Sequence, residues 1–263
     1  MTDRYDFKAL FKSYNGAIQR TCEEQLMNIT SPKEYDALIN SARISWENTL
    51  VEGNKPSWYF NQIAEKQQLQ ELFIKAVEIC DEFIPVSLID TIKRLKGNEI
   101  IENFAFGDSD MILQSTAIRT LAQLENGNYC EKLTEAIYAT EEELIKEAAR
   151  QALIDLKPSA ADFLIDRLQN LQVIKEDDYH LMIALVDIDK EKRTNRVYTV
   201  LKDCFIKADD KSLAARCLVD YNDKRAVVFL RGYLIKNVNK AEELEQQEIR
   251  EAIRKLGGRE DDI

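Results

Sequence analysis

Glycine, proline and histidine are scarce in this sequence. Its 263 residues include Gly 8, Pro 4 and His 1. So few turn-forming residues exclude a fold with many tight hairpins, since glycine and proline dominate such turns. Leu, Ala, Glu, Lys and Gln, which favour helices, are plentiful instead. The composition therefore predicts helices joined by short connections.

A metal centre and a nucleophilic triad are poorly supported. A structural zinc site needs four Cys or His ligands, and a catalytic nucleophile needs a base beside it. The chain has one histidine, His180, in the run YHLMIALVDI, and we interpret it as a rim residue at the start of a helix. The cysteines are odd in number and lack a CxxC pair: Cys22, Cys80, Cys130, Cys204 and Cys217. We expect no metal and no cofactor.

Other catalytic motifs are weak. The sequence has no GxGxxG and no P-loop. The run DIDKEKRTN at 187–195 lacks the Gly and terminal Glu of a calcium loop, which favours a polar turn between helices. The acidic run Glu141–Glu143 is typical of a solvated helix start. A carboxylate-based hydrolase stays open, because sequence does not place two carboxylates across a cleft.

Positive charge is also in deficit. Acidic residues number 47 against 36 Lys and Arg, a net charge of −11, with no basic block. Phosphate binding depends on clustered cations, so this balance argues against nucleic acid and anionic membranes as partners, although a locally basic face remains open. We also expect a reduced, cytoplasmic protein, because the chain lacks a signal-like start and a membrane-length apolar run.

A repeated pattern begins near Ser87. It consists of a small residue, a large apolar residue, two variable positions and another apolar residue, preceded three positions earlier by an apolar or small one. The small positions are separated by 29, 32, 32, 33 and 35 residues. They are Thr91, Thr120, Ala152, Ala184, Cys217 and Ala252. Such spacing predicts a helix with a seam of small residues in each unit.

Second amphipathic stretches lie between these helices, at 128–139, 160–171, 195–207 and 223–237. The unit is thus a helix pair, which buries its faces by stacking on its neighbours. We predict an all-α fold, a right-handed α-α superhelix. An irregular helical bundle is the alternative.

The runs AARQALIDL (148–156), TAIRTLAQL (116–124) and SLAARCLVDY (212–221) resemble the first helix of HEAT repeats. Their spacing is similar to that of compact bacterial HEAT-like units, including bilin-lyase-type repeats. Tetratricopeptide repeats have a period of about 34 but a signature that is missing here. The resemblance covers about residues 87–257 and implies a HEAT-like solenoid.

The remaining segments flank this array. Residues 1–86 are predicted to form three helices, at about 6–28, 31–51 and 56–83, as an N-terminal cap or divergent repeats. Residues 258–263 are predicted to be a frayed tail. No linker rich in Gly, Pro or Ser separates the parts, so one continuous structural unit is expected.

The resemblance to HEAT-like arrays implies that the second helices line the concave face. Their polar positions include Arg167, Arg196, Lys202, Lys224, Arg225 and Arg231. Such a patch suits an acidic peptide or a phosphate. Alternatively, these cations pair with acids such as Asp166, Asp203 and Asp223. Trp58 is a further candidate, either as an exposed anchor or, with Trp46 and Tyr59, as part of the core.

Together these features predict a non-catalytic scaffold or adaptor that binds a protein or peptide. One alternative is a nucleic-acid enzyme resembling the alkylpurine DNA glycosylases, HEAT-like proteins that bind DNA on a basic, aromatic-bearing concave face. The net charge of −11 and the lack of Trp in 87–257 depart from that pattern. A chromophore-lyase-like partner protein, suggested by the repeats, is the other alternative.

Overall fold

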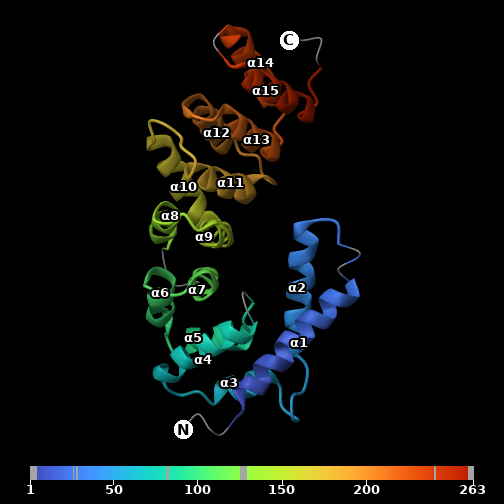
Figure 1. The fold of residues 1–263 in the computed structure, drawn as a ribbon, viewed down its shortest axis with the longest axis vertical. Coiled ribbons are helices and arrows are strands. Elements are labelled where there is room, and N and C mark those ends of the chain that lie inside the picture. Colours follow the sequence, from blue (N-terminus) through green and yellow to red (C-terminus); the bar gives the residue numbers. More distant parts are fainter. Residues whose placement is uncertain are drawn as a thin grey trace. The chain divides into compact units, whose positions relative to one another are not determined.

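The chain is entirely helical where its structure is described. A computed structural model describes residues 5–25, 27, 29–80, 83–124, 129–239 and 241–259, which contain fifteen α-helices and no strand (Figure 1). This confirms the all-α prediction. No helix in these ranges has the length and apolar character to cross a membrane. The chain divides into two compact units, Met1–Gly127 and Asn128–Ile263.

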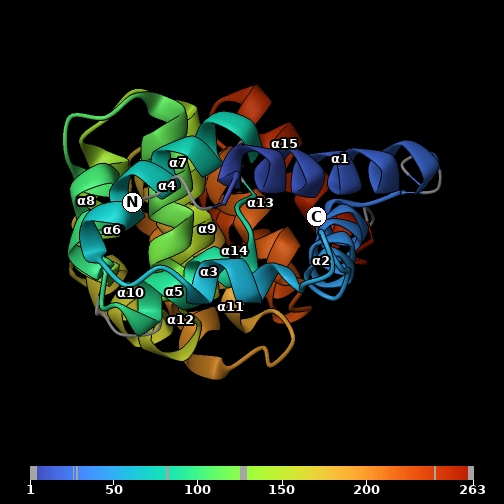
Figure 2. The same cartoon turned by 90° about the horizontal axis from the view of Figure 1, so that it is seen from below.

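The first unit holds the N-terminal helices and the start of the repeats. Its helices are α1 (Phe7–Gln25), α2 (Pro32–Glu47), α3 (Pro56–Asn61), α4 (Lys66–Cys80), α5 (Val86–Arg94), α6 (Asn98–Phe106) and α7 (Met111–Gln123). Helix α1 packs against both α2 and α4, and its second half extends beyond α4 (Figure 2).

Aromatic side chains build the core of this unit. The buried rings of Phe7, Phe11 and Phe60 contact one another at centroid separations of 5.6 to 6.5 Å. Tyr14 meets Trp46 edge to face at 5.0 Å, and both are buried. Aromatic pairs of this kind stabilise beyond their area burial by about 1 kcal/mol each, so these contacts join α1 to α2 and α3.

The prediction of one helix over 56–83 is wrong. The chain leaves the helical path between Asn61 and Lys66, giving α3 and α4. The guanidinium of Arg94 on α5 donates hydrogen bonds to the carbonyls of Phe60, at 3.3 Å, and Ile63, at 2.8 Å. These carbonyls therefore have a partner outside the helix, which stabilises the break.

The second unit is a stack of helix pairs. Its helices are α8 (Cys130–Tyr138), α9 (Glu143–Asp155), α10 (Pro158–Asn170), α11 (Asp178–Asp189), α12 (Asn195–Lys207), α13 (Lys211–Tyr221), α14 (Arg225–Asn237) and α15 (Glu243–Lys255). Helices α9, α11, α13 and α15 pack successively and form the seam layer; α8, α10, α12 and α14 form the second layer (Figure 1). Each pair contacts its neighbours in sequence, as repeats do.

The seam layer takes its name from the small residues predicted along it, and all of them are buried. In this unit they are Ala149, Ala152, Ala184, Ala214, Cys217 and Ala252. Small side chains let neighbouring helices approach closely, which explains why they recur where α9, α11, α13 and α15 meet. The hand of any superhelix stays a prediction.

Capping residues and a loop contact fix the connections. Asp110 and Asp210 cap α7 and α13 by accepting hydrogen bonds from two backbone N–H groups each, a role that Asp commonly has at helix starts. The buried Ile174 forms a parallel bridge with Ala208. This bridge joins the α10–α11 connection to the α12–α13 connection.

Asp189 is a buried junction between three helices. One carboxylate oxygen accepts hydrogen bonds from the backbone N–H and hydroxyl of Thr194, at 2.8 and 2.9 Å, and from the hydroxyl of Tyr221, at 2.7 Å. Asp189 ends α11, Thr194 caps α12, and Tyr221 ends α13. The run 187–195 is thus a polar connection between helices, as predicted.

Two glycines, Gly257 and Gly258, turn the chain back against the end of α15. Gly257 adopts a positive φ of 86°, and the N–H of Gly258 donates to the carbonyl of Ile253 at 2.9 Å. A Cβ on Gly258 would lie 2.5 Å from Ile253 and 3.0 Å from Val227, so glycine is required for this approach. The predicted frayed tail lies outside the described residues from 260 onward.

Candidate binding surface

Five of the six basic residues selected from the sequence lie within second-layer helices, and the sixth, Lys224, is the N-cap of α14. Arg167 is on α10, Arg196 and Lys202 are on α12, and Arg225 and Arg231 are on α14. Their charges are not equally available to a ligand, because each side chain already has a different contact.

Arg167 lies along the surface between α8 and α10. Its guanidinium is 5.6 Å from the ring centroid of Tyr138, a cation–π distance. The Tyr138 hydroxyl donates to Asp178 at 2.5 Å, and burial together with that carboxylate raises the pKa of Tyr138. Arg167 is exposed but oriented by this ring.

Arg196 is paired with acids on the adjacent helix. Its guanidinium bonds the carboxylate of Asp162 and, at 3.3 Å, that of Asp166. All three side chains are more than half exposed, so the pair adds at most about 1 kcal/mol to stability. The pairing with Asp166 confirms the alternative raised from the sequence, in which this cation is compensated by a neighbour.

Arg225 is also compensated. It bonds the carboxylate of Asp223 at 2.5 Å, and its guanidinium lies 4.3 Å from the ring centroid of Tyr198. The hydrogen bonds from Arg225 lower the pKa of Asp223. The predicted pairing with Asp223 is therefore confirmed, and the contact with Tyr198 joins α14 to α12.

Lys202 contacts an aromatic ring, and one contact of Arg231 is with a backbone carbonyl. The Lys202 ammonium lies 5.9 Å from the ring centroid of Phe229 on α14. The Arg231 guanidinium donates to the carbonyl of Arg259 at 3.1 Å. An aromatic ring leaves the formal charge of Lys202 in place.

Trp58 belongs to the first unit. It is 39% exposed, and its ring meets those of Tyr5 and Tyr59 edge to face at 5.3 and 5.1 Å. Trp46 and Tyr59 are buried. Of the three aromatic candidates, Trp58 therefore offers the most accessible face.

Comparison with protein-family models, curated proteins and solved structures finds no match. The resemblance to HEAT repeats thus remains a prediction from the residues quoted for it. Function has to be argued from the surface chemistry of this chain.

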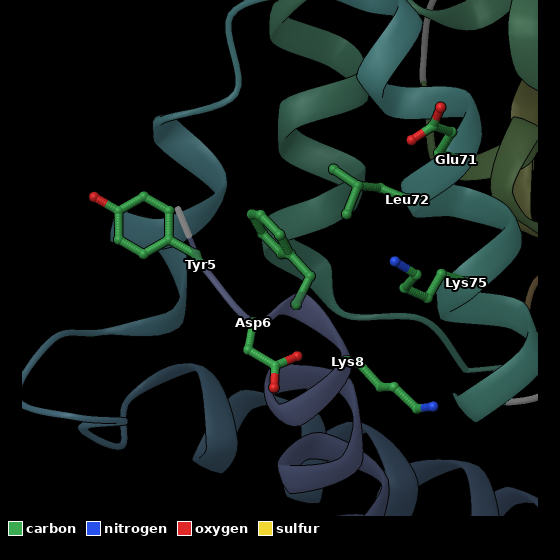
Figure 3. A pocket seen from close by; sticks show the side chains of 7 residues that line it. Tyr5, Asp6, Lys8, Glu71, Leu72 and Lys75 are labelled. Atoms are coloured by element: carbon green, nitrogen blue, oxygen red, sulfur yellow. The ribbon is translucent and has the colours of Figure 1, made fainter. Parts of the chain in front are cut away.

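Two of the surface cavities are lined by residues that the structure describes. One, of about 310 Å³, lies between the start of α1 and helix α4 and is lined by Asp6, Lys8, Glu71 and Lys75 with an apolar floor (Figure 3). These four charged side chains are exposed and of both signs. Since ligand pockets usually have mostly apolar walls and bury most of the ligand, this cavity lacks the character of a small-molecule site.

The second cavity, of about 260 Å³, lies between α8 and α10. Glu131 and Glu135 line one side, and Phe163, Asp166 and Arg167 line the other. No group of three His, Cys, Asp or Glu in the described ranges is close enough together to hold a metal ion. The cavity is a small recess in the second layer.

His180 lies in the first turn of α11, as predicted. It is half-buried, and burial lowers the pKa of its imidazole. Its Nδ1 atom is buried without a hydrogen-bond partner among the described residues. The nearby charged groups are Glu143, Lys146, Glu147 and Arg150, which place it in the polar surface of the seam layer.

Part of the second-layer surface was not predicted from the sequence. Lys236, Ile206, Val228 and Ile235 are exposed on α12 and α14. The sequence of α14, RAVVFLRGYLIKN, holds two signals of this surface. It contains three basic residues and no acidic one, and it has Gly232 near its centre. The absence of acids over thirteen residues is notable in a chain with net charge −11.

Proposed function

We propose that this chain is a non-catalytic scaffold that binds a protein or peptide on its second layer. The resemblance to HEAT-like arrays implies that these helices line the concave side of a solenoid. The odd number of widely spaced cysteines, without a CxxC pair, supports a reduced, cytoplasmic location, and we propose partner recognition as the role.

One observation carries the proposal. Side chains of successive second-layer helices contact one another: Arg167 with Tyr138, Arg196 with Asp166, Arg225 with Tyr198, and Lys202 with Phe229. They give one continuous, chemically varied face over four helices. An extended face suits a polypeptide, whose recognition spreads over many side chains, better than it suits a small molecule.

The test is affinity capture from native cytosol followed by lysine-directed cross-linking and mass spectrometry. If the proposal is correct, one partner links reproducibly to Lys202, Lys207 or Lys236 of the second layer. Links confined to seam-layer lysines such as Lys190 and Lys255 would contradict the proposed face. A failure to capture any protein across several salt concentrations would contradict the scaffold itself.

The DNA-glycosylase alternative is tested in parallel with duplex DNA at low salt, where electrostatic affinity is greatest. Binding there would favour that alternative. The chromophore-lyase-like alternative predicts visible colour in the captured material.

A further inference from the structure

One part of the second layer differs from the rest in its charge. Helices α12 and α14 carry six basic side chains and one acidic one, Asp203, within their bounds. Arg196 and Arg225 are compensated by acids on or beside neighbouring helices. Among the described residues, no carboxylate lies within ion-pair distance of Lys202 or Lys236. Positive charge therefore remains exposed on these two helices.

The same helices expose large apolar side chains. Val228 is 74% exposed, Ile235 65% and Ile206 57%. Val228 and Ile235 are seven residues apart, two helical turns, so they lie on one side of α14. Single exposed apolar residues are common, but several together with a basic surround are typical of interaction sites.

Gly232 lies between these two residues, in the middle of α14. Glycine inside a helix costs about 0.5 to 1 kcal/mol relative to alanine, and a packing contact often accounts for it. Here a Cβ would meet nothing within 4 Å. Because Gly232 has no side chain, it leaves a notch on the surface of α14. Val228 lies one turn before this notch, and Ile235 lies almost one turn after it.

Aromatic contacts make the two helices one surface. The ring of Phe205 on α12 meets those of Phe229 and Tyr233 on α14 at 5.4 and 4.9 Å. Lys202 lies over the Phe229 ring, which places its ammonium beside α14. Each helix has thirteen residues and a length of about 20 Å. We call this surface the α12–α14 face; it comprises Lys202, Ile206, Val228, Gly232, Ile235 and Lys236.

We propose that the α12–α14 face docks an acidic, amphipathic helical segment of a partner protein, with apolar side chains at the Gly232 notch and carboxylates at Lys202 and Lys236. This inference rests on the proposed scaffold function and specifies its partner. A partner helix of similar length would cover the face. The apolar residues of an amphipathic helix recur every three or four positions, which is also the spacing of Val228, Gly232 and Ile235.

An anionic membrane fits this surface less well. Charges in water are screened beyond about 8 to 10 Å, so a short peptide interacts with the local excess of cations. A membrane is an extended surface that also meets the surrounding acidic protein. Membrane-surface helices moreover present Trp, Phe and Leu, whereas the exposed apolar residues here are Val and Ile around a notch.

The test begins with peptide display. Random peptides of about 16 residues, roughly four helical turns, are selected on the full-length protein. We expect enriched sequences with Asp or Glu flanking apolar residues at helical spacing. Enriched peptides without an acidic excess would overturn the inferred partner chemistry.

Affinities of the enriched peptide are then measured by fluorescence anisotropy. The charge-reversed variant Lys202→Glu with Lys236→Glu should bind at least about tenfold more weakly. The matched control, Lys12→Glu with Lys66→Glu, reverses two exposed lysines of the first unit and should bind as the wild type does. Equal affinity of the α12–α14 variant and this control would overturn the site.

Gly232→Leu separates docking from folding. A Cβ at this position meets no atom within 4 Å, and leucine raises helix propensity, so the melting temperature should be maintained or increased. Because it fills the notch, affinity should fall about tenfold. Unchanged affinity would overturn the role of the notch.

Vesicles with one third phosphatidylserine provide the competing outcome. If the protein binds these vesicles through Lys202 and Lys236 and no peptide is enriched, the partner of the α12–α14 face is a membrane and the inferred peptide partner is wrong. A peptide that binds through other second-layer residues would overturn this inference and leave the scaffold function intact.

Discussion

Replacing Tyr221 with Phe should measure the strength of the junction at Asp189. Tyr221 is fully buried, and Asp189 is 6% exposed. The substitution keeps the aromatic ring, so it leaves no large cavity and removes only the hydroxyl. The carboxylate of Asp189 retains the two hydrogen bonds from Thr194 and loses the one from Tyr221.

A hydrogen bond to a charged group contributes about 1.5 to 3 kcal/mol. We therefore expect the free energy of unfolding of the second unit to fall by about 2 kcal/mol. With a urea m-value of about 2 kcal/mol per molar, the midpoint of unfolding should fall by about 1 M.

The assay is urea unfolding followed by far-ultraviolet circular dichroism. Tryptophan fluorescence gives a separate signal, because Trp46 and Trp58 both lie in the first unit. The matched control is Tyr198→Phe, whose hydroxyl makes no hydrogen bond to the described residues. If Tyr221→Phe changes the midpoint no more than this control does, the junction at Asp189 does not stabilise the unit.

Three further predictions concern other buried groups. Burial lowers the pKa of His180, so the contribution of neutral His180 to stability should be complete above its ordinary pKa of about 6.5 and decline as the pH falls. The variant His180→Gln should therefore lose less stability than the wild type between about pH 7 and 5. Urea midpoints that fall equally with pH in the variant and the wild type would contradict this. Burial raises the pKa of Cys204 and of Cys217 to about 12. At mildly alkaline pH, iodoacetamide should therefore label the half-buried Cys22 first, as measured by peptide mass spectrometry. Early labelling of Cys217 would show that its helix opens readily. Ala184→Leu should overpack the seam layer and cost about 1 to 3 kcal/mol, detected as a lower melting temperature; an unchanged melting temperature would indicate a looser seam.

The seam could be predicted because its signal is local and repeated. Positions such as Ala152, Ala184 and Ala252 recur beside large apolar residues, and burial at each follows from helical periodicity. Asp166 and Asp223 could be named as partners of arginines for a similar reason. They lie on or just before second-layer helices, whose order the repeat predicts.

Other features depend on residues distant in sequence. The break between α3 and α4 depends on Arg94, about thirty residues later, whose hydrogen bonds to Phe60 and Ile63 no local pattern reveals. The exposure of Val228 and Ile235 was equally hidden, because apolar residues at helical spacing ordinarily indicate a buried face. Only the neighbours of α14 decide which of its sides stays open.

The helix pairs of the second unit pack mainly against their neighbours, and α14 and α15 form the last pair described. Local unfolding in such an array proceeds from its ends, because a terminal pair has a neighbour on one side only. Amides of α14 should therefore exchange with deuterium sooner than those of α11, which the Asp189 junction and the Ile174 bridge hold from both sides. A partner that spans α12 and α14 would hold these two pairs together, so its binding should slow the deuterium exchange of α14.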